Sequence, residues 1–97
     1  MIYRIETASS QIKRELCRIP PLDRQSVAEA VQRLADDPRH SGVKQLELNT
    51  YRLRVGDYRV IYKVFDAEGV VLIGREARRS ESTYRGLRRL FELGYSD

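Results

Sequence analysis

The sequence predicts an α+β domain of two layers, in which an antiparallel four-stranded sheet packs against an N-terminal helical hairpin and a C-terminal helix follows. Residues 50–65 alternate apolar and polar side chains on both sides of Gly56-Asp57, which is the pattern of a β-hairpin. Helix-like apolar spacings precede this hairpin over residues 8–36 and follow it over residues 80–93. The chain of 97 residues suffices for one hydrophobic core and is too short for two, so we expect a single domain over residues 1–97.

The chain opens with a predicted strand over residues 1–6, which places Tyr3 and Ile5 on one side. Residues 7–10 then supply the small hydroxyl side chains that cap helix N-termini. The next apolar residues recur at spacings of four and three, as on one face of a helix: Ala8, Ile12, Leu16 and Ile19. We therefore expect a short first helix here.

A second helix is predicted from Pro21 to Asp36. Pro20 and Pro21 separate it from the first helix, because proline fits the first turn of a helix but not its interior. Its apolar stripe consists of Val27, Ala30, Val31 and Leu34. Asp37-Pro38 ends the helix, so the two helices are expected to form the helical hairpin.

Cys17 and His40 are each the only residue of their kind. Cys17 has no disulfide partner within the chain, and its apolar neighbours indicate a buried small hydrophobe. One cysteine and one histidine make no ligand cluster, so we expect no metal and no cofactor. We expect His40 to be an exposed residue of the connector that follows the second helix rather than a catalytic base.

The hairpin can be assigned residue by residue. A two-residue loop that starts with glycine favours a type II′ turn, and it places Val55 opposite Tyr58 and Arg54 opposite Arg59. One face of the hairpin is then apolar and is expected to face the core: Tyr51, Leu53, Val55, Tyr58, Val60, Tyr62 and Val64. The other face, called the basic face below, carries Arg52, Arg54, Arg59 and Lys63.

Like charges that face each other across an antiparallel pair destabilise it by about a few tenths of a kcal/mol or more. An arginine-rich strand face is either a solvated surface balanced by nearby carboxylates or a site for an anion. Few acidic residues lie near the basic face, and guanidinium groups present fixed forks that match phosphate oxygens. We therefore interpret it as a phosphate-binding surface.

After the hairpin, residues 67–69 form a second predicted turn and Val70 to Arg75 a further strand. This strand is almost continuously apolar, which indicates a central position in the sheet. Residues 80–93 are predicted to form the last helix, with Gly94 at its C-terminal end. Its apolar stripe consists of Tyr84, Leu87, Leu90 and Phe91.

The positive charge is concentrated in the second half of the chain. Residues 50–91 contain ten Lys or Arg against five Asp or Glu, whereas residues 1–49 contain eight against seven. This asymmetry suits a polyanion such as nucleic acid, or an acidic protein partner. No apolar run approaches the roughly 18 residues that span a bilayer, and no signal-peptide pattern opens the chain, so we expect no membrane association and a cytoplasmic protein.

With these elements in place, the segment GVKQLELNTYRLRVGDYRVIYKV resembles the RelE toxins of the RelE/ParE toxin–antitoxin superfamily. The resemblance extends over the whole chain and is most specific from Tyr51 to Val64. It implies a type II toxin that enters the ribosomal A site, cleaves mRNA there without a metal ion and so inhibits translation. It also implies a cognate antitoxin that silences the toxin, and hetero-oligomers of the two that bind operator DNA.

The resemblance also implies roles for individual residues. The residues that match the family's catalytic positions are Arg52, Arg54, Arg59, Tyr84 and Arg78, with Arg79 in place of Arg78 if the loop is shifted by one residue. We expect four further residues to bind RNA: Lys44, Lys63, Arg79 and Arg85. The chain departs from the family at Ala77-Arg78-Arg79, where many members have a His-Arg pair, so the general base stays open.

Several residues near the predicted site have two interpretations. Glu76 and Glu81 flank the arginines and serve either as a base or as ion-pair partners of Arg75 and Arg78. Tyr84 is either a catalytic or base-stacking residue or a core aromatic of the last helix. Two other functions also fit the chain: a ParE-like inhibitor of DNA gyrase, and a catalytically silent homologue that binds an antitoxin.

Overall fold

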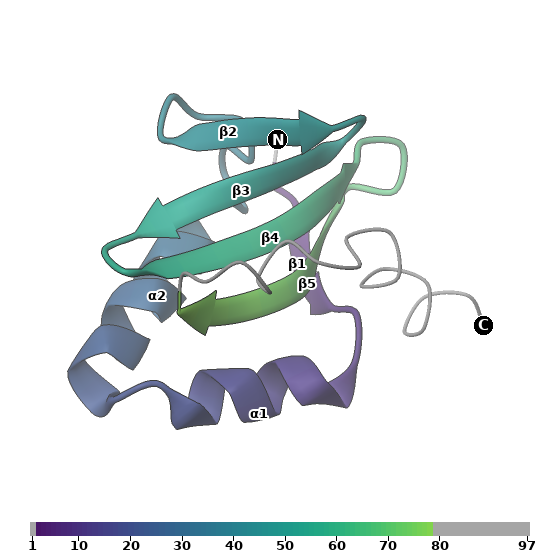
Figure 1. Cartoon of the computed structure of the whole chain (residues 1–97). Coiled ribbons are helices and arrows are strands. Elements are labelled where there is room, and N and C mark those ends of the chain that lie inside the picture. Colours follow the sequence, from purple (N-terminus) through teal and green to yellow (C-terminus); the bar gives the residue numbers. More distant parts are fainter. Residues whose placement is uncertain (1, 79–97) are drawn as a thin grey trace.

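A computed structural model describes residues 2–78 of the chain, and side chains up to residue 75. It shows one five-stranded sheet with two helices packed on one of its faces (Figure 1). The elements follow in the order β1 (Arg4–Thr7), α1 (Ser10–Arg18), α2 (Pro21–Arg33), β2 (Val43–Glu47), β3 (Thr50–Val55), β4 (Tyr58–Phe65) and β5 (Val70–Arg78). Neither of the described helices is long and apolar enough to cross a membrane.

The sheet differs from the predicted four-stranded antiparallel sheet. Its strands lie in the order β1-β5-β4-β3-β2, and β1 pairs with β5 in parallel, with Ile5 opposite Val71. The α+β class is confirmed, but the number of strands and the purely antiparallel pairing were wrong. The partner of β1 lies at the far end of the described chain, and no local pattern indicates the direction of so distant a pairing.

The strand β2 was missed because its sequence, VKQLE, is mostly polar. It pairs only with β3, as an edge strand, so only part of it is buried. The prediction that β5 lies inside the sheet is confirmed, since β1 and β4 flank it. Tyr3 and Ile5 both pack against the main core, as expected for the first strand.

Only Ile19 and Pro20 separate α1 from α2. The two helices meet at a corner in Figure 1 instead of lying side by side, so the predicted helical hairpin is more open than expected. Pro21 occupies the first turn of α2, where its missing N–H costs no hydrogen bond. The helix ends at Arg33, three residues before the predicted end.

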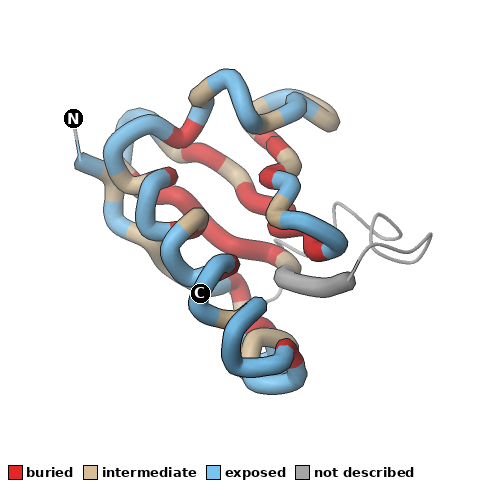
Figure 2. Tube along the Cα trace, turned by 90° about the vertical axis from the view of Figure 1, so that its left-hand side faces the viewer, coloured by how far each residue is buried: buried red, intermediate tan, exposed pale blue. Residues whose placement is uncertain are grey.

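The main core lies between the helices and the sheet, as the buried strands behind the exposed helix turns show (Figure 2). The predicted core face of the hairpin is confirmed in full: six of its seven residues are buried, and Val55 is partly buried against them. The stripe of α2 is confirmed as well, with Val27 and Leu34 fully covered. Each Å² of apolar surface removed from water contributes about 25 cal/mol to stability. This buried layer is therefore the main source of stability.

A smaller apolar cluster lies on the opposite face of the sheet. It consists of Ala8, Ile61, Val70 and Leu72, with Leu46 and Phe65 packed against it. Ala8 was expected in the stripe of the first helix, and that was wrong. It continues β1 instead, and its N–H donates to the Ile73 carbonyl at 2.8 Å.

Cys17 is exposed, so the prediction of a buried thiol was also wrong. Its neighbours Leu16 and Ile19 face the core, but Cys17 lies one position off their stripe. The guanidinium of Arg24 crosses to this end of α1. Its Nη2 donates to the carbonyls of Cys17 and Ile19 at 3.2 and 3.1 Å, which satisfies carbonyls that the helix end leaves free.

A polar network joins the first strand, the connector after α2 and the turn after β4. Arg39 donates from Nη1 and Nη2 to the two carboxylate oxygens of Asp66 at 2.9 and 2.8 Å, and from Nε to the Tyr51 hydroxyl at 2.8 Å. The Tyr3 hydroxyl also donates to Asp66, at 2.7 Å. The hydrogen bonds from Arg39 hold the pKa of the Asp66 carboxyl below its ordinary value.

Candidate nucleic-acid interface

The turn between β3 and β4 has the predicted geometry. Gly56 has a φ of 57°, and Asp57 is not among the residues with positive φ, which is the combination that a type II′ turn requires. The register follows from this turn: Val55 pairs with Tyr58 and Arg54 with Arg59. The turn therefore determines which side chains share the basic face.

Like charges face each other on the basic face, as the sequence predicted. Arg54 lies opposite Arg59, and Lys44 of β2 lies opposite Arg52, so Lys44 extends the basic face across a third strand. Within residues 2–75, none of the three hairpin arginines forms an ion pair. In the described part of the chain, salt bridges to neighbouring carboxylates therefore do not balance the charges of these three arginines.

Arg59 is the most buried charged side chain of the described residues, with 4% of its surface exposed. Its Nη1 donates to the carbonyls of Gly56 and Tyr58, both at 2.9 Å. Its Nε is buried and has no hydrogen-bond partner within the described structure. A buried cation with spare donors is costly unless an anion supplies the missing acceptors.

Arg52 shares this feature. Its Nε is buried and has no hydrogen-bond partner in the described structure, while the residue as a whole is half-buried. Arg54, which follows Arg52 by two residues on β3 and lies opposite Arg59, is exposed. The basic face therefore combines two arginines held against the sheet with one that is exposed to solvent, an arrangement suited to a phosphate backbone.

Arg75 is a cation whose partner the sequence did not indicate. It lies opposite Ile61 in the register, and its Nε approaches Glu15 of α1 at 3.9 Å. The sequence offers Glu76 and Glu81 as its partners instead. The contact with Glu15 depends on how α1 packs along β5, and residue spacing in the sequence gives no sign of that packing.

The structure places the remaining predicted residues only in part. The backbone of Arg78 ends β5 opposite Tyr58, and Ala77 is the register partner of Arg59. Side chains beyond residue 75 lie outside the described part, as do the whole of Arg79, Glu81, Tyr84 and Arg85 and the last predicted helix. Their predicted roles stay predictions.

His40 lies in the connector after α2 and is half-buried rather than exposed. Its Nδ1 accepts a hydrogen bond from the Gly42 N–H at 3.0 Å, and its carbonyl accepts one from the Val43 N–H. The ring thus stabilises the turn that leads into β2. This use of the imidazole is a structural role.

Residues 6–83 match the sequence model of a family described as the ParE toxin of the type II toxin–antitoxin system parDE. The chain belongs to this family. The predicted resemblance to the RelE/ParE superfamily is therefore confirmed, and the protein is a type II toxin of that superfamily. The comparison with curated proteins gave no match.

Solved structures show the same fold for this ParE-family toxin. A chain of the archaeal RelE–RelB complex from Pyrococcus horikoshii is 31% identical, with 84% of this chain and 99% of that chain covered and a TM-score of 0.73. A chain of the RelBE2 toxin–antitoxin complex from Mycobacterium tuberculosis is 26% identical over 81% and 100%, with a TM-score of 0.70. The isolated E. coli RelE toxin, at 20% identity over 91% and 98%, has a TM-score of 0.68 and supports the fold alone.

Proposed function

We propose that this toxin is a ribosome-dependent endonuclease that cleaves mRNA in the ribosomal A site and so inhibits translation. The observation that supports this most is Arg59, a nearly buried guanidinium whose Nε lacks an acceptor among the described residues. Arg52 and Arg54 lie beside it on a rigid two-stranded platform. Such a platform is suited to binding phosphate groups and to stabilising negative charge that develops on one of them.

The reaction we propose is attack of an mRNA 2′-hydroxyl on the adjacent phosphorus. The bond to the 5′-oxygen breaks, which leaves a cyclic phosphate and a free 5′-hydroxyl. Arg59, fixed by its two carbonyl acceptors, would stabilise the charge of the pentavalent phosphorane, while Arg52 and Arg54 bind flanking phosphates. We assign proton transfer to Tyr84 with Arg78, and substrate positioning largely to the ribosome.

Four further cations complete the proposed RNA-binding surface: Lys44, Lys63, Arg79 and Arg85. Lys44 lies on the basic face beside Arg52, where it would meet the same strand of RNA. The proposed reaction requires no metal ion, because arginine supplies the positive charge. We propose a cytoplasmic location, where ribosomes and mRNA are found.

We also propose that a cognate antitoxin binds across the basic face. Opposite charge steers association, so we expect this antitoxin to be acidic and to fold partly on binding. The complex would then form a hetero-oligomer that binds operator DNA. Calorimetry with the product of the adjacent open reading frame tests the interaction, and the absence of binding heat and of co-purification would contradict it.

The deciding experiment follows macromolecular synthesis after induction of the toxin without its antitoxin. We expect incorporation of labelled amino acids to stop before incorporation of labelled thymidine. Cleavage of mRNA on programmed ribosomes should then be measured in single turnovers with the purified toxin. Unimpaired protein synthesis in the presence of folded toxin would rule out the nuclease.

Inhibition of DNA gyrase is the second candidate, and the match to the ParE family favours it. Binding to gyrase needs no acid–base groups, and this chain has Ala77-Arg78-Arg79 where many RelE toxins have a His-Arg pair. This candidate predicts that thymidine incorporation stops first and that purified toxin inhibits gyrase supercoiling. A silent antitoxin-binding homologue would stop neither process.

A further inference from the structure

The solvent side of α1, called the α1 surface below, carries only positive charges. Its cations are Lys13, Arg14 and Arg18, and all three are exposed. The one acid of this helix, Glu15, is turned inward: 14% of its side chain is exposed, and its carboxylate lies 3.9 Å from the Nε of Arg75. Within the described part of the chain, none of the three exposed cations forms an ion pair. The proposed cleavage reaction uses none of them.

The stability of α1 does not explain these charges. Arg14 and Arg18 are four residues apart and therefore lie side by side on the helix, where like charges repel each other. Lys13 lies at the end of the first turn, where the helix dipole favours acids, and this turn contains none. Only Arg18, in the last turn, interacts favourably with the dipole. The α1 surface thus keeps cations at a cost to the helix, as the hairpin keeps opposed arginines.

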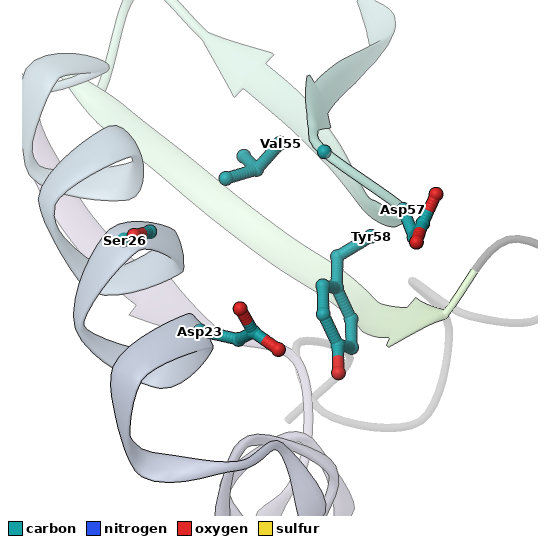
Figure 3. A pocket seen from close by; sticks show the side chains of 6 residues that line it. Asp23, Ser26, Val55, Asp57 and Tyr58 are labelled. Atoms are coloured by element: carbon teal, nitrogen blue, oxygen red, sulfur yellow. The ribbon is translucent and has the colours of Figure 1, made fainter.

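The neighbouring helix α2 has a surface of mixed charge. Its exposed residues include Asp23 and Glu29 as well as Arg33, and the guanidinium of Arg24 is held by carbonyls at the end of α1. Figure 3 shows the Asp23 carboxylate directed toward the Tyr58 ring, at the pocket between α2 and the β3–β4 turn. Among the described helices, the excess of positive charge therefore lies on α1.

The α1 surface and the basic face lie on different sides of β5. Figure 1 shows α1 next to β5, with β4, β3 and β2 following on the other side of that strand. Neighbouring strands lie about 4.8 Å apart, so the cations of α1 do not reach the phosphate that Arg59 would hold on β4. An anion bound to the α1 surface is therefore not the phosphate that is cleaved.

We propose that the α1 surface binds the phosphate backbone of ribosomal RNA while the basic face holds the mRNA. Exposed cations without an apolar surround suit a phosphate backbone, which is bound mainly through charge. A protein partner fits less well, because the centre of a protein interface is apolar. The exposed large apolar residues of the described chain all lie outside α1: Ile2, Leu22 and Leu48. The inference rests on the proposed function, which places the toxin inside a particle built largely of RNA.

The first test measures binding without cleavage. We would titrate ribosomes programmed with an mRNA whose A-site codon carries 2′-O-methyl groups, which removes the attacking hydroxyl. Lys13→Gln, Arg14→Gln and Arg18→Gln should each weaken binding by about threefold to tenfold, and each should reduce the slope of log affinity against log salt by about one. The matched control Arg33→Gln removes the same charge from the exposed surface of α2 and should bind as wild type. Thermal melting checks that all four variants fold.

The outcomes separate this inference from the nuclease proposal. Wild-type affinity of all three α1 variants, or an equal loss in Arg33→Gln, would overturn the inference and leave the nuclease standing. Ribosome binding that depends on the α1 cations, without cleavage of unmodified mRNA, would support the inference and contradict the nuclease. A wild-type toxin that does not bind ribosomes would overturn both. At saturating toxin, the α1 variants should cleave unmodified mRNA at the wild-type rate, because α1 does not touch the reacting phosphate.

The second test identifies the RNA that α1 contacts. Cys17 is the only cysteine of the chain and is exposed on α1, so a photo-reactive crosslinker can be attached there without any substitution. We expect crosslinks from this position to ribosomal RNA in programmed ribosomes. The control carries the crosslinker on α2, through Gln32→Cys in a Cys17→Ser protein, and should not give these crosslinks. Crosslinks from Cys17 to mRNA alone, to ribosomal proteins alone or to no component would overturn the assignment.

Discussion

Arg59 illustrates how a single side chain is positioned by the turn that precedes it. Its two hydrogen bonds run to carbonyls of Gly56 and Tyr58, so the turn that sets the hairpin register also fixes the guanidinium. Repulsion with the opposed Arg54, taken by itself, would make the removal of Arg59 neutral or stabilising. The burial of Arg59 changes that expectation, because its removal leaves two carbonyls without their donor.

Substitutions of Arg54 and Arg59 should therefore both lower activity, but only substitution of Arg59 should lower stability. We expect Arg54→Ala to lower mRNA cleavage about tenfold or more while the free energy of unfolding stays equal or rises by about a few tenths of a kcal/mol. Arg59→Ala should lower cleavage as well, but destabilise the fold by about 1–3 kcal/mol. Single-turnover cleavage and urea unfolding measure both quantities. Arg33→Ala, an exposed change on α2, is the control, and an Arg59→Ala protein as stable as wild type would contradict the assigned hydrogen bonds.

The Asp66 carboxylate predicts a pH dependence of stability. Its pKa in the folded protein lies below its ordinary value of 3.8, because Arg39 and Tyr3 donate hydrogen bonds to the ionised form. Its contribution is therefore complete above that ordinary value and is lost as the pH falls through the folded value. The difference in melting temperature between wild type and Asp66→Asn should be constant from about pH 5 to 8 and shrink below about pH 4. A difference that grew in acid would contradict the prediction, and Asp36→Asn serves as the exposed control.

Among the secondary-structure elements, those with local signals were predictable. The hairpin register, the stripe of α2 and the interior position of β5 all followed from residue spacing and turn chemistry. The strand β2 and the parallel β1–β5 pair did not, because a polar edge strand has weak patterning and a distant pairing has none. The same distinction holds for the sites. The basic face lies within one hairpin, whereas the contact between Arg75 and Glu15 depends on how α1 packs along β5.

The β3–β4 turn makes a prediction for the hairpin as a unit. Gly56→Ala should destabilise the protein by about 1 kcal/mol, because alanine at a φ of 57° is strained even though its Cβ meets no atom within 4 Å. Gly56→Asn should recover part of this loss, since asparagine tolerates positive φ better. Urea unfolding of the three proteins measures the effect. Equal stability of the alanine and glycine proteins would show that the turn does not hold this conformation.

For the whole molecule, stability should decrease from the middle of the sheet to the β2 edge. Residues Val60 to Tyr62 of β4 and Val71 to Ile73 of β5 are almost completely buried, whereas Lys44 and Gln45 of β2 are exposed. We expect amide hydrogens of β4 and β5 to exchange only through global unfolding, and those of β2 to exchange much faster through local opening. NMR-detected hydrogen exchange measures both, and protection in β2 equal to that in β5 would contradict the prediction.

The parallel pairing of β1 with β5 also affects how the protein folds during its synthesis on the ribosome. The first strand to be synthesised must wait for the last described strand before it can join the sheet. Until β5 emerges from the ribosome, the edge of β4 that pairs with β5 is unpaired, and the apolar side chains of β4 are not yet buried. An unpaired apolar strand makes the growing chain prone to association with other chains. Ile61 and Arg59 also lack their neighbours on β5 at this stage, so the sheet that carries the basic face is not yet complete. The sheet that carries the basic face is therefore complete only after β5 has been synthesised, and we expect an antitoxin made beforehand to be present by then.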